Sequence, residues 1–155
     1  MSESLVELIK DTKLLKGLNE KQLLKFAKRC EVKSFGVEEA IIRANDSTRD
    51  LYILINGACN VEVDVDKYVQ HFVVDRLNSG DIFGEMSFLE ENPRLATVIC
   101  KEPSKIVRIS AQNFKELIED DSDIGIAIMR NLALILANKI RETHEKFFKK
   151  RDLIF

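Results

Sequence analysis

Glu85 and Arg94 stand in one stretch, FGEMSFLEENPRLATV (residues 83–98), whose other residues are mostly small or apolar. Arg94 follows a proline and offers a planar fork of N–H donors that suits a phosphate. Gly84, directly before Glu85, lets the backbone approach a ligand closely. Residues 85–90 can form a short helix, whose first N–H groups would face an anion placed there. These residue types indicate a site for one anionic phosphate.

The carboxylate of Glu85 would repel a phosphate unless it has a separate task in the site. Accepting a hydrogen bond from a hydroxyl is such a task, and a sugar hydroxyl close to a phosphate satisfies Glu85 and Arg94 together. Apolar strand faces around the pair would suit a flat base. The combination indicates a ribose phosphate held inside a β-barrel. A salt bridge between Glu85 and Arg94 that closes a surface loop explains the same two residues equally well.

The chain around this stretch is predicted to run as helices, then strands, then helices. Residues 3–10 and 19–30 have helical spacing, and Asn19 is expected to cap the second helix, with Gln22 three residues later. From there to residue 109 the pattern changes to short β-rich segments separated by turn residues. These segments include LYILINGACNVEVDVD, HFVVDRL, LATVICKE and KIVRIS. Strands of this length and spacing predict a sandwich or a jelly-roll barrel.

The first of these segments carries Asn56-Gly57 between two strand-like runs, which is a strong signal for a β-hairpin. Beyond it, Val61, Val63 and Val65 alternate with acidic residues, which is the period of a half-buried strand. A hairpin is therefore predicted here, and its second strand is expected to bury one face.

Two helices are predicted after the strands. Ser110 is expected to cap a helix over residues 111–119, and Ser122 to cap a long last helix that runs to about residue 149. The long helix carries a stripe at helical spacing, formed by Met129, Leu132, Leu136, Ile140, Thr143 and Phe147. The stripe fits packing against this domain's own sheet or pairing with a second chain. The length and the charged second half of the helix favour pairing, so we expect a homodimer through residues 124–149.

Composition and length narrow the functional class. A chain of 155 residues suits one domain, and its formal net charge of −2 argues against nucleic-acid binding by this chain alone. No signal peptide is visible, and the longest apolar run, residues 124–137, is interrupted and too short to span a bilayer. Widely spaced cysteines, three in number, indicate ordinary semi-buried thiols and a reducing cytoplasm. We therefore expect a cytoplasmic protein with no membrane partner.

The sequence shows no constellation that would carry catalysis. Its two histidines, His71 and His144, stand far apart, so no zinc or iron site is expected. It also contains none of the common phosphate-loop, dinucleotide, metalloprotease or nucleophile-elbow motifs. We expect neither a metal cofactor nor an enzymatic activity.

Residues 83–98 resemble the phosphate-binding cassette of cyclic nucleotide-binding domains, which occur in protein kinase A regulatory subunits, cyclic-nucleotide-gated channels and the bacterial catabolite activator protein. The matched residues are Phe83, Gly84, Glu85, Pro93, Arg94, Ala96, Thr97 and Val98. The likeness extends along most of the chain, through LLKGLNEKQLLKFAKRCEVKSF, DLYILINGACNVEV, LNSGDIFGE and LANKIRETHEKF. On this basis the chain is identified as a member of that family.

The resemblance implies a mainly β fold with flanking helices: a jelly-roll-like β-roll, N-terminal helices and a long C-terminal helix. By this resemblance, residues 1–155 would form a single domain. This domain would contain an N-terminal helical segment (1–30), the roll with its cassette (31–109), and a hinge with a lid or dimerisation helix (110–155). The segment DLYILINGACNVEV corresponds to a hairpin of the roll.

The resemblance also implies roles for individual residues. Glu85 would bind the ribose 2′-hydroxyl, and Arg94 would pair with the cyclic phosphate. Thr143 would contact the base from the last helix, and His144 would reach the ligand of a partner subunit. The implied ligand-binding residues are Gly84, Glu85, Met86, Arg94, Leu95, Ala96 and Thr143, with Val61 and Val74 near the base.

Leu95 departs from the family pattern, which usually has Ala, Ser or Thr after the arginine. A threonine there is the family's usual contact to guanine, so its absence favours cyclic AMP over cyclic GMP as the ligand. The bulkier side chain also leaves open a pseudo-receptor that keeps the fold for dimerisation or docking and binds no nucleotide. Glu38 and Asn45 stand where the family often has glycine, and asparagine is the non-glycine residue that best tolerates a positive φ.

The expected function is therefore a non-catalytic cytoplasmic receptor that binds cyclic AMP, with cyclic GMP as the alternative ligand. Binding would be relayed through the C-terminal helix. The apolar residues Leu153-Ile154-Phe155 favour a further alternative, a sensor that forms part of a larger effector protein. The expected partners are a cyclic nucleotide, a second copy of the chain and a downstream effector.

Overall fold

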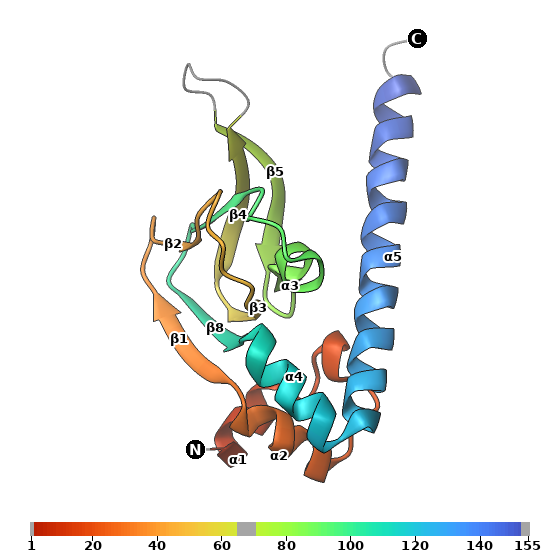
Figure 1. Ribbon diagram of the computed structural model, residues 1–155. Coiled ribbons are helices and arrows are strands. Elements are labelled where there is room, and N and C mark those ends of the chain that lie inside the picture. The colour runs from red at the N-terminus through yellow and green to blue at the C-terminus, as the bar shows by residue number, and fades with distance from the viewer. Residues whose placement is uncertain (1, 65–70, 153–155) are drawn as a thin grey trace.

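A computed structural model describes residues 2–64 and 71–152, in which a β-roll has helices gathered at one end and the long helix α5 beside it (Figure 1). The elements are α1 (Ser2–Ile9), η1 (Lys13–Leu15), α2 (Glu20–Lys28), β1 (Glu31–Phe35), β2 (Ala40–Ile42), β3 (Leu51–Asn56), β4 (Ala58–Asp64), β5 (His71–Asn78), β6 (Ile82–Phe83), α3 (Glu85–Glu90), β7 (Thr97–Cys100), β8 (Ser104–Ile109), α4 (Ala111–Asp120) and α5 (Ser122–Asp152). None of the described helices is both long enough and apolar enough to cross a membrane. The expectations for Val65 and for Leu153-Ile154-Phe155 lie outside the described residues.

Two four-stranded antiparallel sheets form the roll, with strand orders β1-β8-β3-β6 and β2-β7-β4-β5. The predicted mainly β fold with flanking helices and a long C-terminal helix is confirmed. The first four residues of β3 are all buried, so both faces of the strand lie in a core there. Leu51 and Ile53 join the core shared with the helices, whereas Tyr52 and Leu54 join the core between the sheets. β3 therefore connects the two cores.

The predicted hairpin at Asn56-Gly57 is wrong. β3 belongs to the first sheet and pairs with β6 and β8, whereas β4 belongs to the second sheet and pairs with β5 and β7. Gly57 has a φ of 113°, and a Cβ at this position would lie 2.2 Å from the Ser104 hydroxyl oxygen. The glycine is required because it turns the chain from one sheet into the other against a closely packed neighbour.

The helix caps follow the sequence. Asn19 Oδ1 accepts a hydrogen bond from the Gln22 backbone N–H at 2.9 Å, and Gln22 Oε1 accepts one from the Asn19 N–H at 3.0 Å. Ser110 Oγ accepts a hydrogen bond from the Asn113 backbone N–H at 3.0 Å. These bonds satisfy N–H groups that the first turn of a helix leaves without a partner, and the predicted caps at Asn19 and Ser110 are confirmed. The third predicted cap is wrong, because α5 begins at Ser122 itself and this serine is a helical residue.

Replacing Ser110 with alanine is expected to lower the free energy of unfolding by about 0.5–2 kcal/mol, because the first turn of α4 loses its side-chain acceptor. Urea denaturation followed by circular dichroism measures the change. Ser110→Asp is the matched control, since aspartate caps helices as well as serine does, and it should keep wild-type stability. Equal stabilities of the alanine and aspartate variants would contradict this role for the Ser110 hydroxyl.

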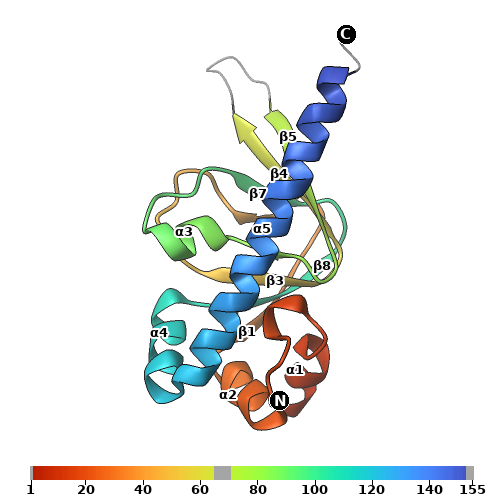
Figure 2. The same ribbon diagram turned by 90° about the vertical axis from the view of Figure 1, so that its right-hand side faces the viewer.

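The first half of α5 packs on the helical end of the molecule (Figure 2). Ile124, Ile128 and Leu132 are no more than 1% exposed and belong to the core that the helices share. The side-chain amide of Asn131 donates to two backbone carbonyls beside η1, at 2.9 and 2.8 Å. These contacts anchor α5 at its base.

The second half of α5 runs alongside the roll, as both ribbon views show (Figures 1 and 2). Its side chains are mostly exposed. Of the predicted stripe, Leu132 is buried in this domain's core and Leu136 packs against that core. The exposed members of the stripe are Met129, Ile140, Thr143 and Phe147. The first half of the helix thus packs within its own domain, as one of the two alternatives expected. It packs on the other helices and not on the sheet. Pairing with a second chain through the rest stays a prediction.

Candidate ligand-binding site

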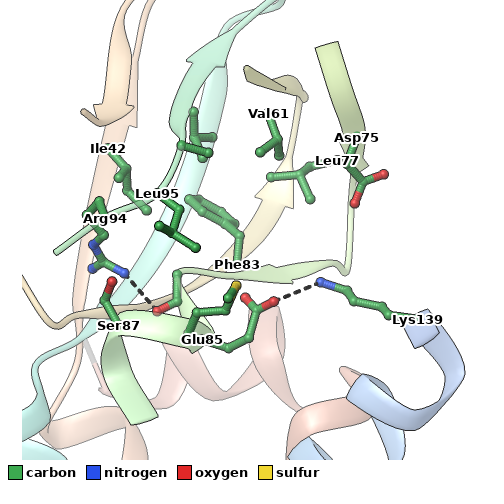
Figure 3. Close-up of a pocket in the computed structure, with 14 residues that line it drawn as sticks. Ile42, Val61, Asp75, Leu77, Phe83, Glu85, Ser87, Arg94, Leu95 and Lys139 are labelled. Atoms are coloured by element: carbon green, nitrogen blue, oxygen red, sulfur yellow. Dashed lines mark hydrogen bonds and ion pairs between the residues drawn. The ribbon is translucent and has the colours of Figure 1, made fainter. Parts of the chain in front are cut away.

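A pocket of about 140 Å³ opens where the cassette helix α3, the strands of the roll and helix α5 meet (Figure 3). Glu85 and Arg94 both lie on its wall. Its apolar surface comes from strands of both sheets, including Val61 on β4 and Phe83 on β6. The pocket therefore presents a polar end next to an apolar surface.

Most of the residues expected to bind a ligand line this one pocket, namely Val61, Gly84, Glu85, Met86, Arg94, Leu95 and Ala96. Val74 does not line it, and its side chain is 58% exposed. The β4–β5 register sets Val61 opposite Asp75, and side chains alternate along a strand. Asp75 and Leu77 therefore turn toward the pocket, and Val74 turns away.

Helix α5 reaches the pocket through Lys139 and not through Thr143. Thr143 is exposed, and its hydroxyl donates to the Lys139 backbone carbonyl at 2.8 Å. His144, the next residue, is also exposed. Lys139 Nζ lies 3.5 Å from Glu85 Oε1 (Figure 3) and donates to the Ile82 carbonyl at 3.3 Å. The helix residue that faces the pocket thus lies one turn before the residue expected from the resemblance.

Gly84 shapes the start of α3 at the pocket. Its φ of 80° lies in the left-handed region, and a Cβ here would lie 2.8 Å from the Asp50 carbonyl oxygen and 3.0 Å from Arg94 Nη1. Its carbonyl accepts a hydrogen bond from Arg94 Nη1 at 2.7 Å. Glu85 follows as the first residue of α3, so the glycine sets both charged groups relative to one another.

Gly84→Ala is expected to lower the free energy of unfolding by more than the roughly 1–2 kcal/mol that a left-handed alanine costs. The additional loss arises because the new methyl group would press on Asp50 and Arg94. Gly80→Ala isolates the backbone cost, since Gly80 has a φ of 93° and nothing within 4 Å of an added Cβ. Urea denaturation of both variants compares the two losses, and equal losses would contradict the close packing around Gly84.

Arg94 is buried, with 4% of its surface exposed. Its Nη1 donates to the Gly84 carbonyl at 2.7 Å, and its Nη2 donates to the Asp50 carbonyl at 2.8 Å. Its Nε donates to Thr48 Oγ1 at 3.3 Å. Each terminal nitrogen of a guanidinium carries a second N–H, which these bonds leave available. Arg94 is therefore held in place by its own domain and can still offer a pair of donors to one anion.

The positive charge of Arg94 is kept despite its burial. Burial lowers the pKa of the guanidinium, and the nearby Tyr52, Asp50 and Glu85 oppose this shift. An arginine pKa starts above about 12, so the group stays cationic near neutral pH.

The backbone of Arg94 is held as well. Its carbonyl accepts a hydrogen bond from the Asn45 N–H at 2.7 Å. Asn45 lies in a turn with a φ of 72°, which asparagine tolerates better than other non-glycine residues. Backbone and side chain of Arg94 are thus both fixed.

The ion pair of Glu85 within the described residues is with Lys139 and not with Arg94. The Glu85 side chain is 14% exposed and the Lys139 side chain is 33% exposed. The alternative in which a Glu85–Arg94 salt bridge closes a surface loop does not describe this structure. The three side chains instead border a common pocket, with Arg94 and Lys139 at opposite ends of it (Figure 3).

Residues outside the expected ligand set complete the pocket. They are Ile42, Asp75, Leu77, Phe83, Ser87, Val98 and Lys139. Strand alternation would have located Asp75 and Leu77 once the partner of Val61 was known. Lys139 lies seven residues, or about two helical turns, after the buried Leu132 and so on the same side of α5. A lysine at that position of an apolar stripe is the sequence feature from which its place at the pocket could have been predicted.

Two of the three cysteines have thiols whose pKa is raised by burial, and the described residues include no grouped metal ligands. Cys59 and Cys100 are buried, with their sulfur atoms 3.7 Å apart, and burial raises the pKa of Cys59 to about 12. Burial also raises the pKa of Cys30. Thiols that stay protonated are poor nucleophiles. Among residues 2–64 and 71–152, no three His, Cys, Asp or Glu side chains are grouped so as to hold a metal ion.

Comparison with known proteins identifies the family of this chain. A family model described as the cyclic nucleotide-binding domain matches residues 32–121. The chain is 31% identical over 124 residues to the cAMP-activated global transcriptional regulator CRP of Pasteurella multocida, which covers 79% of this chain and 59% of that protein. It is 31% identical over 119 residues to potassium channel AKT1 of Arabidopsis thaliana, which covers 77% of this chain and 14% of the channel. The chain thus spans only part of the length of these relatives.

A solved structure supports the fold. A cyclic nucleotide-binding domain from Methylobacillus flagellatus superposes with a TM-score of 0.84 at 19% identity, over 96% of this chain and 83% of that one. At that identity the likeness bears on the fold alone, and it matches the two-sheet roll with its long C-terminal helix. The family match spans more than half of the sequence. The chain therefore belongs to the cyclic nucleotide-binding domain family.

Proposed function

We propose that this chain is a regulatory module that binds cyclic AMP in the pocket between α3, the roll and α5. The observation that carries the proposal is that the buried Arg94 guanidinium and the Glu85 carboxylate line the same pocket. A cyclic nucleotide combines an anionic phosphate, a ribose hydroxyl and a flat base, which suit these groups and the apolar walls. The relative named as a cAMP-activated regulator supports the choice of cyclic AMP.

Each part of the ligand would meet a different part of the pocket. Arg94 would hold the phosphate through charge-assisted hydrogen bonds, and Glu85 would accept a hydrogen bond from the ribose 2′-hydroxyl. The base would lie along the apolar walls, to which Val61 and Leu77 contribute. Cyclic GMP is the alternative ligand, and Leu95 offers guanine no hydroxyl.

Binding would be relayed through α5 in a non-catalytic cytoplasmic protein. The contact between Lys139 and the cassette supports this route, because it joins α5 to the pocket directly. The exposed apolar side chains on the second half of α5 support a homodimer through residues 124–149. The module would act on an effector in the same protein or in a partner, as the larger size of its relatives suggests.

A second candidate function is a pseudo-receptor that keeps this fold for docking or dimerisation and binds no nucleotide. Leu95 favours it, since this bulky side chain is 70% exposed and lies on the pocket wall beside the arginine. Arg94 argues against it. A buried cation with unused donors is unfavourable unless an acceptor reaches it, and a phosphate is such an acceptor.

The melting temperature of the protein with added nucleotides separates the two functions. A ligand that binds only the folded state raises the melting temperature. We expect cyclic AMP to raise it most, cyclic GMP to raise it less, and linear 5′-AMP, which carries a second phosphate charge, to raise it least. An unchanged melting temperature with both cyclic nucleotides at concentrations up to about 1 mM would favour the pseudo-receptor.

A further inference from the structure

Lys139 gives α5 a charged contact with the cassette. Among the described residues it is the one residue of α5 that lines the pocket. Its ammonium contacts two oxygens, Glu85 Oε1 at 3.5 Å (Figure 3) and the Ile82 carbonyl at 3.3 Å. The contact is partly shielded from water, because the Lys139 and Glu85 side chains are 33% and 14% exposed. α5 therefore touches the residue to which the ribose hydroxyl is assigned.

The charges around the pocket balance only when Lys139 is counted. The charged side chains that line it are Asp75, Glu85, Arg94 and Lys139, two anionic and two cationic. Without Lys139, two carboxylates would face one guanidinium, and the lining would carry a net negative charge. A cyclic nucleotide is an anion, so it would then enter against an unfavourable field. Lys139 supplies the second cation that an anionic ligand needs.

Lys139 also holds the carboxylate of Glu85. One oxygen, Oε1, faces the ammonium, and the other keeps free lone pairs for a hydroxyl donor. A glutamate side chain is flexible, and a partner that already holds it lowers the entropy lost when a ligand binds. The Ile82 carbonyl fixes the ammonium in turn. The pocket is therefore prepared for the ribose by a residue that belongs to α5.

We propose that Lys139 is a positioning residue that orients Glu85 and offsets its charge, so that binding of an anionic cyclic nucleotide depends on α5 lying against the roll. The inference rests on the proposed function, and it names Lys139 as the residue that links the position of α5 to ligand binding in the pocket. α5 holds Lys139 in place through Ile128 and Leu132, which are 0% and 1% exposed. Coupling between two sites is reciprocal, so a ligand that strengthens the Glu85–Lys139 contact also favours the docked helix.

A double-mutant cycle tests this proposal. Calorimetric titration with cyclic AMP is carried out on the wild type, Lys139→Met, Glu85→Gln and the double variant. We expect Lys139→Met to weaken binding about threefold to fivefold, which is the upper part of the range for one partly exposed ion pair. In the Glu85→Gln background the same change should alter affinity by less than about twofold, because a neutral amide needs no counter-charge. An equal loss in both backgrounds would overturn the proposal.

Two further variants serve as controls. Lys146→Met removes a lysine about two helical turns later on the same helix, where the side chain is exposed, and should leave affinity unchanged. Lys139→Arg keeps the charge, should retain most of the affinity, and keeps the test decisive if Lys139→Met folds poorly. Equal affinities of Lys139→Met and Lys146→Met would overturn the role of Lys139 and leave the proposed function intact. Failure of the wild type to bind would overturn both.

Discussion

Replacing Arg94 with alanine is expected to weaken the binding of cyclic AMP by about 2–5 kcal/mol, or roughly 30-fold to 5,000-fold. The loss is large because the guanidinium is buried and its remaining N–H donors are the only cationic donors at that end of the described pocket. Isothermal titration calorimetry of the two proteins measures it. Unchanged affinity would remove Arg94 from the site.

The same substitution also affects the fold, so stability has to be measured beside affinity. The Gly84 and Asp50 carbonyls lose their arginine donors, although the Gly84 carbonyl keeps the Phe88 N–H at 3.3 Å. A hydrogen bond to a charged donor contributes about 1.5–3 kcal/mol to stability. Arg94→Lys is the informative control. It keeps the positive charge but cannot reproduce the planar fork, and should bind more weakly than the wild type and more tightly than the alanine variant. Titrations are compared at a temperature at which circular dichroism shows every variant to be folded.

Ile128→Ala is expected to lower the free energy of unfolding by about 2–5 kcal/mol. Ile128 is 0% exposed on the face of α5 that packs on the helical core, so the shorter side chain leaves a cavity that the neighbouring helices fill only in part. Urea denaturation followed by circular dichroism gives the change. Ile124 is equally buried in the same core, so Ile124→Ala should cause a similar loss.

The matched control lies two residues away on the opposite side of the helix. Ile126 is 67% exposed, so Ile126→Ala removes the same atoms from a surface position and should change stability by no more than about 0.5 kcal/mol. Similar losses for the two variants would contradict the assignment of the buried and exposed faces of α5.

Features decided by local chemistry could be predicted from the sequence. The caps at Asn19 and Ser110 form as expected because a side-chain oxygen needs only the backbone three residues further on. The gathering of Glu85 and Arg94 at one pocket is similarly local, since only the short helix α3 and the turn after it separate them. The cassette, residues 83–98, could therefore be predicted from the sequence without knowledge of the strands and helices that surround it.

Features decided by pairing between distant segments could not be predicted. Asn56-Gly57 has the composition of a hairpin turn, yet β3 pairs with β8 and β4 pairs with β7, which no local pattern reveals. The placement of Val74 failed for a related reason, because a register shift between Val61 and Glu62 decides which side chains of β5 face the pocket. A change of one residue in register exchanges the two faces of a strand.

The position of α5 relative to the pocket was also beyond the sequence. Thr143 and Lys139 are one turn apart, and both lie at positions that a helix could turn toward the roll. Which of them reaches the pocket depends on how the first half of α5 packs against η1 and the other helices. That seating is a tertiary property, set by the burial of Ile124, Ile128 and Leu132.

A crystal structure of the protein with cyclic AMP tests the central claim most directly. The account predicts one nucleotide in the pocket, with phosphate oxygens within about 3 Å of both terminal nitrogens of Arg94 and the 2′-hydroxyl within the same distance of Glu85. Lys139 should remain beside the Glu85 carboxylate. A nucleotide bound elsewhere, or crystals grown with saturating cyclic AMP whose pocket holds none, would contradict the account.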